Sequence, residues 1–390
     1  MPVMAPYLLR HSLMNRALLR FLLPLLLLGW PSGAAEVSIP GQVATAGQLI
    51  ATGATLSTEG AQISGLQFDL EWDAGLNVQI VVGRGLGNSG NLLYSGELAS
   101  RSIRVLISGL DLGTLPDGEL LKLFIVAGSE VGSSQIRLTN LMGATPDGNP
   151  VAVRASATTI RVDPGPSGVT FLPESVLNAA SLSPGPIAPG EIVTFLGAFG
   201  INPDPPPGVV VTVNGVATSV LYASGNQINT VVPMGLDPSN PAELSVRTQN
   251  RQLGQVTVAT ASAAPALFTQ NGTGIGPGAI LNENYSLNST SNPAPAGSVV
   301  MMYGTGFGPL VPPAKDGEPG ILSSTVLPVS AKIAGIPADV LYAGAAPGLP
   351  AGVVQINVRL PLGLTSKPAA TIELQAGNYD IPAGVSIAIR

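Results

Sequence analysis

The sequence of 390 residues contains no cysteine, and His11 is its only histidine. Without cysteine, the chain has no disulfide framework, no thiol nucleophile and no thiolate metal site. Because His11 lies in a segment that we expect to be removed, histidine-based triads and histidine zinc sites are excluded as well. The remaining chain must be stabilised by packing alone.

The first 35 residues have the pattern of a secretory signal peptide. Three arginines precede the apolar run 21–30, and the small residues 32–35 follow it. A run of about ten apolar residues is too short for a bilayer, which takes roughly 20. We predict export, with cleavage after Ala35 or Ala34; Met14 also begins a complete signal peptide.

Charge is scarce, and it is mostly acidic once this leader is removed. The leader carries three arginines and no acid, so its removal leaves 14 basic and 23 acidic residues, a formal net charge of −9. Such a surface disfavours nucleic acids and anionic lipids as partners. No later apolar run reaches the roughly 18 residues of a membrane span, so we predict none in the mature chain.

Short runs of alternating Val, Ile, Leu and Thr recur between turn residues. The chain has 48 glycines and 36 prolines, about a fifth of its residues against roughly 12% in average proteins. No long segment shows a helical period, and this pattern is typical of sandwich strands joined by tight turns. We predict an all-β fold. Example runs are 66–72, 103–108, 120–126, 209–213 and 353–360.

An internal repeat follows the Pro/Gly-rich hexapeptide 163–168, which predicts a linker. Matching segments occur in the same order, and the spacing between them grows only in the loops 308–327 and 344–352. The matched pairs are 188–197 with 295–304, 213–222 with 333–342, and 227–229 with 355–357. The predicted parts are a signal peptide 1–35, a sandwich 36–162, a linker 163–168, a first repeat 169–268, a connector 269–275 and a second repeat 276–390.

The repeated motifs carry their own local expectations. A turn before a strand favours positive φ at Gly190 and Gly297, and 214–215 and 334–335 predict hairpins. In both Gln-Ile-Asn motifs we expect the isoleucine inside and the two amides bonded to loop backbone. A ligand role for these amides stays open, although their presence in both copies favours a structural one. The motif residues are Gln227, Ile228, Asn229, Gln355, Ile356 and Asn357.

The repeat pair, about 175–390, resembles a family of uncharacterised C-terminal domains of secreted acidobacterial proteins. Each copy also looks like an immunoglobulin-like TIG domain, and the resemblance implies export without a known activity. The matching elements are 178–180, 187–190, the two Gln-Ile-Asn motifs, 264–268, 292–294 and 303–306.

Residues 37–162 resemble cohesin modules, the jelly-roll sandwiches that bind dockerins in cellulose-degrading assemblies. The resemblance implies the fold and a receptor role, since the chain contains no dockerin-like calcium repeat. The elements that carry it are 63–73, 103–108, 117–124, 147–151 and 159–162.

Motifs for catalysis are lacking. The G-x-G-x-x-G match at 85–90 precedes 91–96, which has the pattern of a strand or loop instead of the helix that a dinucleotide site needs. Strand alternation places Glu71 and Asp73 beside Asp69 on one solvated face, whereas paired catalytic carboxyls face each other across a cleft. We predict a protein that is not an enzyme and has no cofactor.

Two further kinds of site receive weak support. Calcium at Asp147 or Asp237 lacks an EF-hand pattern, and turn capping by these residues suffices. The Gly-, Asn- and Ser-rich segment 271–292 holds the glycosylation acceptors 284–286 and 288–290, and an exposed connector is the simpler interpretation. We predict no metal site.

Aromatic residues bear on carbohydrate binding, which uses exposed ring faces. Alternation places Trp72 in the core, and Tyr222 and Tyr342 are equivalent in the repeats and therefore structural. Few candidates remain for a sugar platform: Tyr94, Tyr285, Tyr303 and Tyr379.

A protein-binding face is better supported. If alternate residues of 103–108 and 120–126 point inward, Leu106 and Phe124 are exposed beside charged groups on one sheet face. A covering loop, or a register shift of one residue, is the alternative. The sequence thus favours an exported, non-catalytic scaffold that docks a secreted or surface protein, with the repeats as spacer or attachment; a polysaccharide-binding accessory protein in polysaccharide degradation is the alternative. The predicted partner-binding residues are Gln67, Asp69, Glu71, Arg104, Leu106, Lys122 and Phe124.

Overall fold

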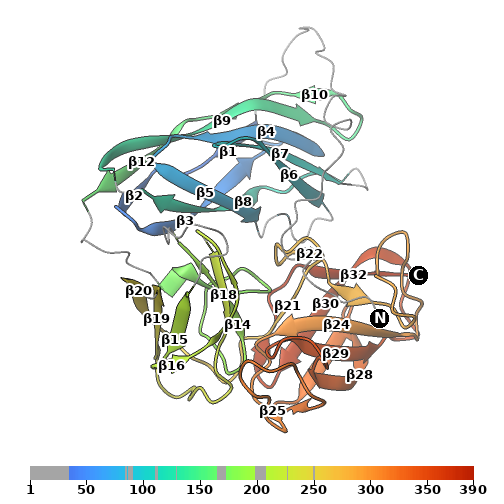
Figure 1. Cartoon of the computed structure of the whole chain (residues 1–390). Helices are drawn as coiled ribbons and strands as arrows, with labels where there is room; N and C mark the ends of the chain where they lie inside the picture. Colours follow the sequence, from blue (N-terminus) through green and yellow to red (C-terminus); the bar gives the residue numbers. More distant parts are fainter. Residues whose placement is uncertain are drawn as a thin grey trace.

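A computed structural model describes residues 35–83, 86, 91–109, 113–128, 130–164, 173–197, 208–225, 227–248 and 251–390. The predicted signal peptide, except Ala35, lies outside these residues, as do most of the linker 163–168 and of the motif 85–90. The predicted all-β class is confirmed: β-sandwiches make up the described chain, with a short 3₁₀ helix, η2, at Pro173–Ser175 (Figure 1). Within these residues no helix is long and apolar enough to cross a membrane.

The N-terminal sandwich consists of two sheets that face each other. The first has the strand order β11-β1-β3-β8-β5 and the second β2-β12-β9-β4-β7-β6, with β10 paired to β9. The first sheet contains β11 Val153–Ala155, β1 Ala35–Ser38, β3 Leu49–Ser57, β8 Gly118–Ala127 and β5 Leu76–Val82. The second contains β2 Gln42–Thr45, β12 Thr158–Asp163, β9 Gly132–Ala144, β4 Gly65–Trp72, β7 Ser102–Gly109, β6 Asn91–Ala99 and β10 Pro150–Val151.

Strict alternation builds the core of this sandwich. Along β4 the side chains of Leu66, Phe68, Leu70 and Trp72 are buried between the sheets, as predicted for Trp72. Burying one such side chain stabilises the fold by about 1.5–3 kcal/mol. The buried core comes from the sandwich itself, apart from Ile275, which packs onto it from beyond the first repeat.

The first repeat is a smaller sandwich of two four-stranded sheets. Its buried core runs from Val176 to Val258. One sheet has the order β13-β14-β18-β17 and the other β16-β15-β19-β20. Their bounds are β13 Val176–Asn178, β14 Ile192–Leu196, β18 Gln227–Val231, β17 Ser219–Ala223, β16 Val216–Ala217, β15 Val210–Val213, β19 Ala242–Thr248 and β20 Arg251–Val258.

The second repeat joins its strands into one sheet of ten that folds around a separate core. The order is β21-β24-β29-β28-β27-β30-β32-β22, with β23 paired to β24 and β31 to β30, and β25 pairs with β26. The bounds are β21 Ala266–Leu267, β24 Val299–Thr305, β29 Val354–Arg359, β28 Ile336–Ala345, β27 Val329–Ile333, β30 Lys367–Ala376, β32 Val385–Ile389, β22 Gly276–Pro277, β23 Ile280–Leu281, β31 Tyr379–Asp380, β25 Leu310–Val311 and β26 Ser324–Thr325.

Equivalent pairings relate the two repeats. Strand β14 pairs with β18 as β24 pairs with β29, and both β17 and β28 shift register at the equivalent residues Leu221 and Leu341. The predicted hairpin turns have positive φ at both residues of 214–215 and of 334–335, and Gly190 and Gly297 have positive φ as well. These turns therefore follow the sequence expectation.

One expectation about the Gln-Ile-Asn motifs is wrong and one is confirmed. The motif amides bond to each other and not to loop backbone: Gln227 Nε2 donates to Asn229 Oδ1, and Gln355 Nε2 to Asn357 Oδ1, each over 2.8 Å. Both isoleucines of the motif are buried, as expected. The two amides lie two residues apart on a strand and therefore share its outer face, where each is the other's nearest partner.

The segment 271–292 is not simply an exposed connector. Strands β22 and β23 pair with β32 and β24, and Asn282 and Asn288 are buried. Asn288 Nδ2 donates to the carbonyl of Ala388 over 2.9 Å, so this acceptor sequence is part of the fold. Asn284 is exposed. The predicted first repeat also ends too late, since β21 pairs with β24 of the second repeat.

Candidate functional site

The predicted partner-binding residues lie on two different faces, because their strands belong to different sheets. Gln67, Asp69 and Glu71 are on β4, and Arg104 and Leu106 are on the neighbouring β7, with their side chains on the outer side of the second sheet. Lys122 and Phe124 are on β8, in the first sheet. The prediction of one shared face is therefore wrong.

Phe124 points outward from its sheet, as predicted, but it is not exposed. The first repeat covers it, and its side chain is only 1% exposed. Lys122 lies over the Phe124 ring, with Nζ 5.5 Å from its centre. The buried cluster consists of Leu49, Phe124 and Val126 from the N-terminal sandwich and Leu177 and Leu196 from the first repeat, with Leu182 packed against it. Alternation determines which side chains leave the core, but it does not show what covers them.

The outer face of the second sheet is open and carries an apolar row. Tyr94 on β6 lies opposite Leu106, which lies opposite Gln67, which lies opposite Met142 on β9. Directly opposite residues share a face of the sheet. Tyr94, Leu106 and Met142 are 40%, 38% and 42% exposed. We define this row as the docking face; Tyr94 and Met142 were not among the partner-binding residues predicted from the sequence, although the same alternation rule identifies them once the pairing is known.

An ion pair borders the docking face in the next row of the sheet. Arg104 Nε and Nη2 donate to the two carboxylate oxygens of Asp69 over 2.6 and 2.7 Å, and Asn140 Nδ2 donates to Asp69 Oδ2 over 2.7 Å. Burial opposes the ionisation of Asp69, but these hydrogen bonds and the charge of Arg104 hold its pKa below the ordinary value. A bidentate pair of this kind fixes both side chains. Asn140 adopts positive φ at a register shift that the sequence did not reveal.

The other carboxyls of this face are also engaged. Thr139 Oγ1 donates to Glu71 over 3.0 Å, and Arg137 Nη2 donates to Asp73 over 2.7 Å. The hydrogen bond from Arg137, followed by that from the Gln135 amide, lowers the pKa of Asp73. The partners of Asp73 favour its ionised form, which does not suit a general acid.

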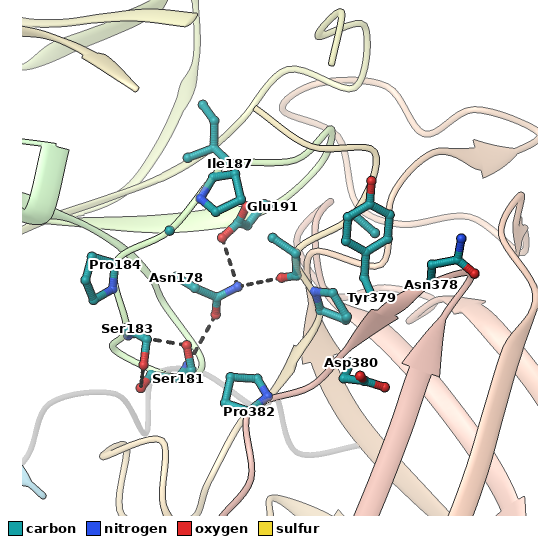
Figure 2. Close-up of a pocket in the computed structure, with 15 residues that line it drawn as sticks. Asn178, Ser181, Ser183, Pro184, Ile187, Glu191, Asn378, Tyr379, Asp380 and Pro382 are labelled. Carbon is teal, nitrogen blue, oxygen red and sulfur yellow. Dashed lines mark hydrogen bonds between the residues drawn. The ribbon is translucent and has the colours of Figure 1, made fainter. Parts of the chain in front are cut away.

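A hollow of about 330 Å³ lies between the two repeats. Its floor contains the buried Glu191, which accepts hydrogen bonds from the amide of Ala188 and from Asn178 Nδ2, each over 2.8 Å. Asn178 also donates to the carbonyl of Ala264 over 2.9 Å, and Figure 2 shows it between the two. Tyr379 and Asp380 line the side that belongs to the second repeat. Asn178, which the Glu191 carboxyl holds in place, therefore ties the start of the first repeat to the chain that enters the second.

The protonation of Glu191 is linked to the stability of this junction. Burial, opposed by the hydrogen bonds from Ala188 and Asn178, raises the pKa of Glu191 from 4.5 to about 8. The folded state thus holds the proton more tightly than the unfolded state does. The resulting stabilisation is complete below pH 4.5 and is lost as the pH rises through 8.

Remaining candidate residues have structural surroundings. Asp237 accepts from the amide of Ser239 and from Asn240 Nδ2, which is the turn capping expected there. The Tyr342 hydroxyl donates to carbonyls of its own repeat, at Ser323 and Ala345, over 3.0 and 2.6 Å. In the described part of the chain, no three His, Asp or Glu residues are placed to hold a metal ion.

Among known proteins, the matches to this chain are solved structures. No family model and no curated protein matches the chain. The chain is similar to a non-cellulosomal cohesin from the archaeon Archaeoglobus fulgidus, with 20% identity and a TM-score of 0.30 over 33% of this chain and 91% of that one. A type I cohesin–dockerin complex from Clostridium thermocellum gives 15% identity and a TM-score of 0.32 over 34% and 96% of the two chains.

A third similar structure is the sixth cohesin of scaffoldin B from Acetivibrio cellulolyticus, solved with a dockerin. It shares 18% identity with a TM-score of 0.31 over 33% of this chain and 99% of that one. Because these identities are low, we assign the residues of the docking face from the strand pairing and not from a comparison with the cohesins. The resemblance of 175–390 to the acidobacterial domain family and to TIG domains stays a prediction.

Proposed function

We propose that this protein is an exported, non-catalytic scaffold whose N-terminal sandwich docks a secreted or cell-surface protein on its docking face. The observation that carries the proposal is the row formed by Tyr94, Leu106 and Met142, three exposed apolar side chains beside the polar row of Arg104 and Asp69. An apolar centre with a hydrogen-bonded polar rim is the usual anatomy of a protein interface. A dockerin-like protein is one partner of this kind, as the resemblance to cohesins implies.

The neighbouring ion pair supports the same function. Asp69 and Arg104 are held by three hydrogen bonds, so they keep one geometry before a partner arrives. Asp69 is only 2% exposed, contrary to the solvated position expected from the sequence, so Arg104 is the group of this pair that a partner can reach. A pre-organised side chain of this kind loses little entropy on binding. The opposite sheet face cannot serve, because the first repeat covers Phe124. The repeats then act as a spacer or an attachment that leaves the docking face open.

A polysaccharide ligand is the alternative, and the face itself favours protein. Sugar platforms use rows of aromatic rings. Tyr94 is the one aromatic residue in the docking-face row, beside the aliphatic Leu106 and the thioether of Met142. A mixed, flat row of this composition suits side chains of a protein partner.

The test uses the full chain after leader removal as bait for proteins of the native secreted fraction. We expect Leu106→Glu to abolish capture of a specific protein, since it places a charge in the centre of the row. Leu362→Glu is the matched control, because Leu362 is 86% exposed in the second repeat. Capture that survives Leu106→Glu contradicts the proposal, and retention on insoluble polysaccharide that Leu106→Glu abolishes favours the alternative.

A further inference from the structure

The contact between the N-terminal sandwich and the first repeat defines a patch that the second repeat also carries. On the side of the first repeat the patch is formed by three leucines from β13, from the following loop and from the end of β14. They pack against three residues of the first sheet of the N-terminal sandwich. The two sides are Leu177, Leu182 and Leu196, and Leu49, Phe124 and Val126.

Strand register identifies the equivalent of Leu177 in the second repeat. In the first repeat, Leu177 lies opposite Thr194 of β14 and forms an isolated bridge with Pro184. Leu281 lies opposite Met301 of β24, which matches Thr194 in the repeat, and forms the same kind of bridge with Leu287. Leu281 is therefore the counterpart of Leu177.

The loop residue has a counterpart at the same place before the closing bridge, although the loop of the second repeat is one residue shorter. Leu182 has a φ of 49° and donates its amide to the carbonyl of Asn178 over 2.9 Å. Tyr285 has a φ of 63° and donates its amide to the carbonyl of Asn282 over 2.8 Å. Non-glycine residues rarely adopt this conformation, and both residues stand two positions before the residue that closes the bridge, so Tyr285 occupies the place of Leu182.

The third counterpart follows from the Gln-Ile-Asn motif. Leu196 pairs with Gln227, and Tyr303 pairs with Gln355, the same position in the second copy. Tyr303 lies two residues along β24 from Met301, which is opposite Leu281, so Tyr303 and Leu281 share one face of the sheet. Leu281, Tyr285 and Tyr303 thus form the second-repeat version of the patch.

This second version is open. Tyr285 is 75% exposed and the adjoining Leu287 is 50% exposed, while Leu281 and Tyr303 are only partly buried. In the first repeat, by contrast, Leu177 and Leu196 are buried under the N-terminal sandwich. The hydrogen-bonded amides of Gln355 and Asn357 lie beside the patch and provide a polar edge.

We propose that the patch of Leu281, Tyr285 and Tyr303 docks a partner protein through the outer face of a β-sandwich sheet that bears large apolar side chains. The chain itself contains one example of such a contact, in which Leu49, Phe124 and Val126 supply the apolar face. A second copy of this chain does not supply it, because its own first repeat already covers that face. The partner is therefore another β-sandwich module, and the protein has two docking surfaces.

The N-terminal sandwich alone, residues 35–163, is the probe, because its sheet face has the required chemistry and its core is almost entirely its own. Its folding is first verified by a cooperative thermal transition. The probe is titrated onto the immobilised full chain. The intact contact inside the full chain excludes the probe from the first repeat, since an intramolecular partner has a high effective concentration.

We expect saturable binding that Tyr285→Asp weakens at least tenfold and that Leu362→Asp leaves unchanged. In the probe, Phe124→Ser has the same effect as Tyr285→Asp, and it does not disturb the fold, because Phe124 points away from the core of the isolated sandwich. Leu106→Glu in the probe leaves this binding intact, which separates this proposal from the proposed function. No binding, or binding insensitive to Tyr285→Asp, overturns the proposal.

A second measurement uses only the full chain, in case the probe does not fold. Leu182→Asp combined with Leu196→Asp uncovers the face of the N-terminal sandwich, which then becomes available to the second repeat of another copy. We expect this variant to self-associate in sedimentation velocity, and additional Tyr285→Asp to return it to monomer. Self-association that persists with Tyr285→Asp contradicts the proposal, as does retention on insoluble polysaccharide that Tyr285→Asp abolishes.

Discussion

Replacing Phe124 with alanine distinguishes a buried contact from an exposed docking residue. The ring is 1% exposed between the N-terminal sandwich and the first repeat, in a cluster with Leu49, Val126, Leu177 and Leu196. Truncating a buried Phe to Ala costs about 3–5 kcal/mol. The cluster is small and lies between two sandwiches that can relax, so we expect about 3 kcal/mol.

Differential scanning calorimetry of the full chain measures this loss. A loss of about 3 kcal/mol in a unit of this size lowers the Tm by roughly 10 °C. The cluster couples the N-terminal sandwich to the first repeat. Because Phe124→Ala weakens this coupling, we also expect the thermal transition of the N-terminal sandwich to separate from that of the repeats. Leu106→Ala is the control: its side chain is exposed on the other sheet, and surface substitutions stay within about 0.5 kcal/mol.

A change in the unfolding free energy of only about 0.5 kcal/mol for Phe124→Ala, the range of an exposed site, would refute a covered Phe124. The ring would then be free on the surface, as the sequence pattern suggested. Loss of partner capture without loss of stability would return Phe124 to the docking residues. Loss of stability with partner capture retained supports the covered face.

Two further predictions concern the junction and the leader. Urea unfolding of the full chain should show a free energy that falls between pH 5 and pH 8, because Glu191 has a raised pKa in the folded state; Glu191→Gln should flatten this dependence, and an unchanged slope would contradict it. Mass spectrometry of the exported protein should find Ala35 as its first residue, since Ala35 is buried in β1, where it pairs with Val153 of β11, and cleavage after Ala35 would remove it. A chain that begins at Glu36 would contradict this.

Much of the fold is predictable from local chemistry. Alternation assigned the inward side chains of β4, β7 and β8 correctly, because successive side chains of a strand point to opposite faces. The turn residues 214–215 and 334–335 also behave as predicted, since their backbone requirement is local. The internal repeat emerged from sequence order alone. These features depend on neighbours along the chain.

The candidate site was predictable only in part. Leu106 is exposed as expected, and Gln67, Asp69, Glu71 and Arg104 share its face. The partner Asn140 and the neighbours Tyr94 and Met142 were missed, because strand pairing joins residues that are far apart in sequence. A register shift at Asn140 leaves no signal in the hydrophobic pattern.

The sequence by itself determined the all-β class, the repeat and which side chains leave each strand, because period-two alternation and turn chemistry are local properties. Only the tertiary structure decided which sheet each strand joins and which outer face another sandwich covers. Those outcomes depend on contacts between distant segments, such as Phe124 with Leu196. The same leucine patch is buried in the first repeat and has an open counterpart at Tyr285, a difference that no local pattern encodes.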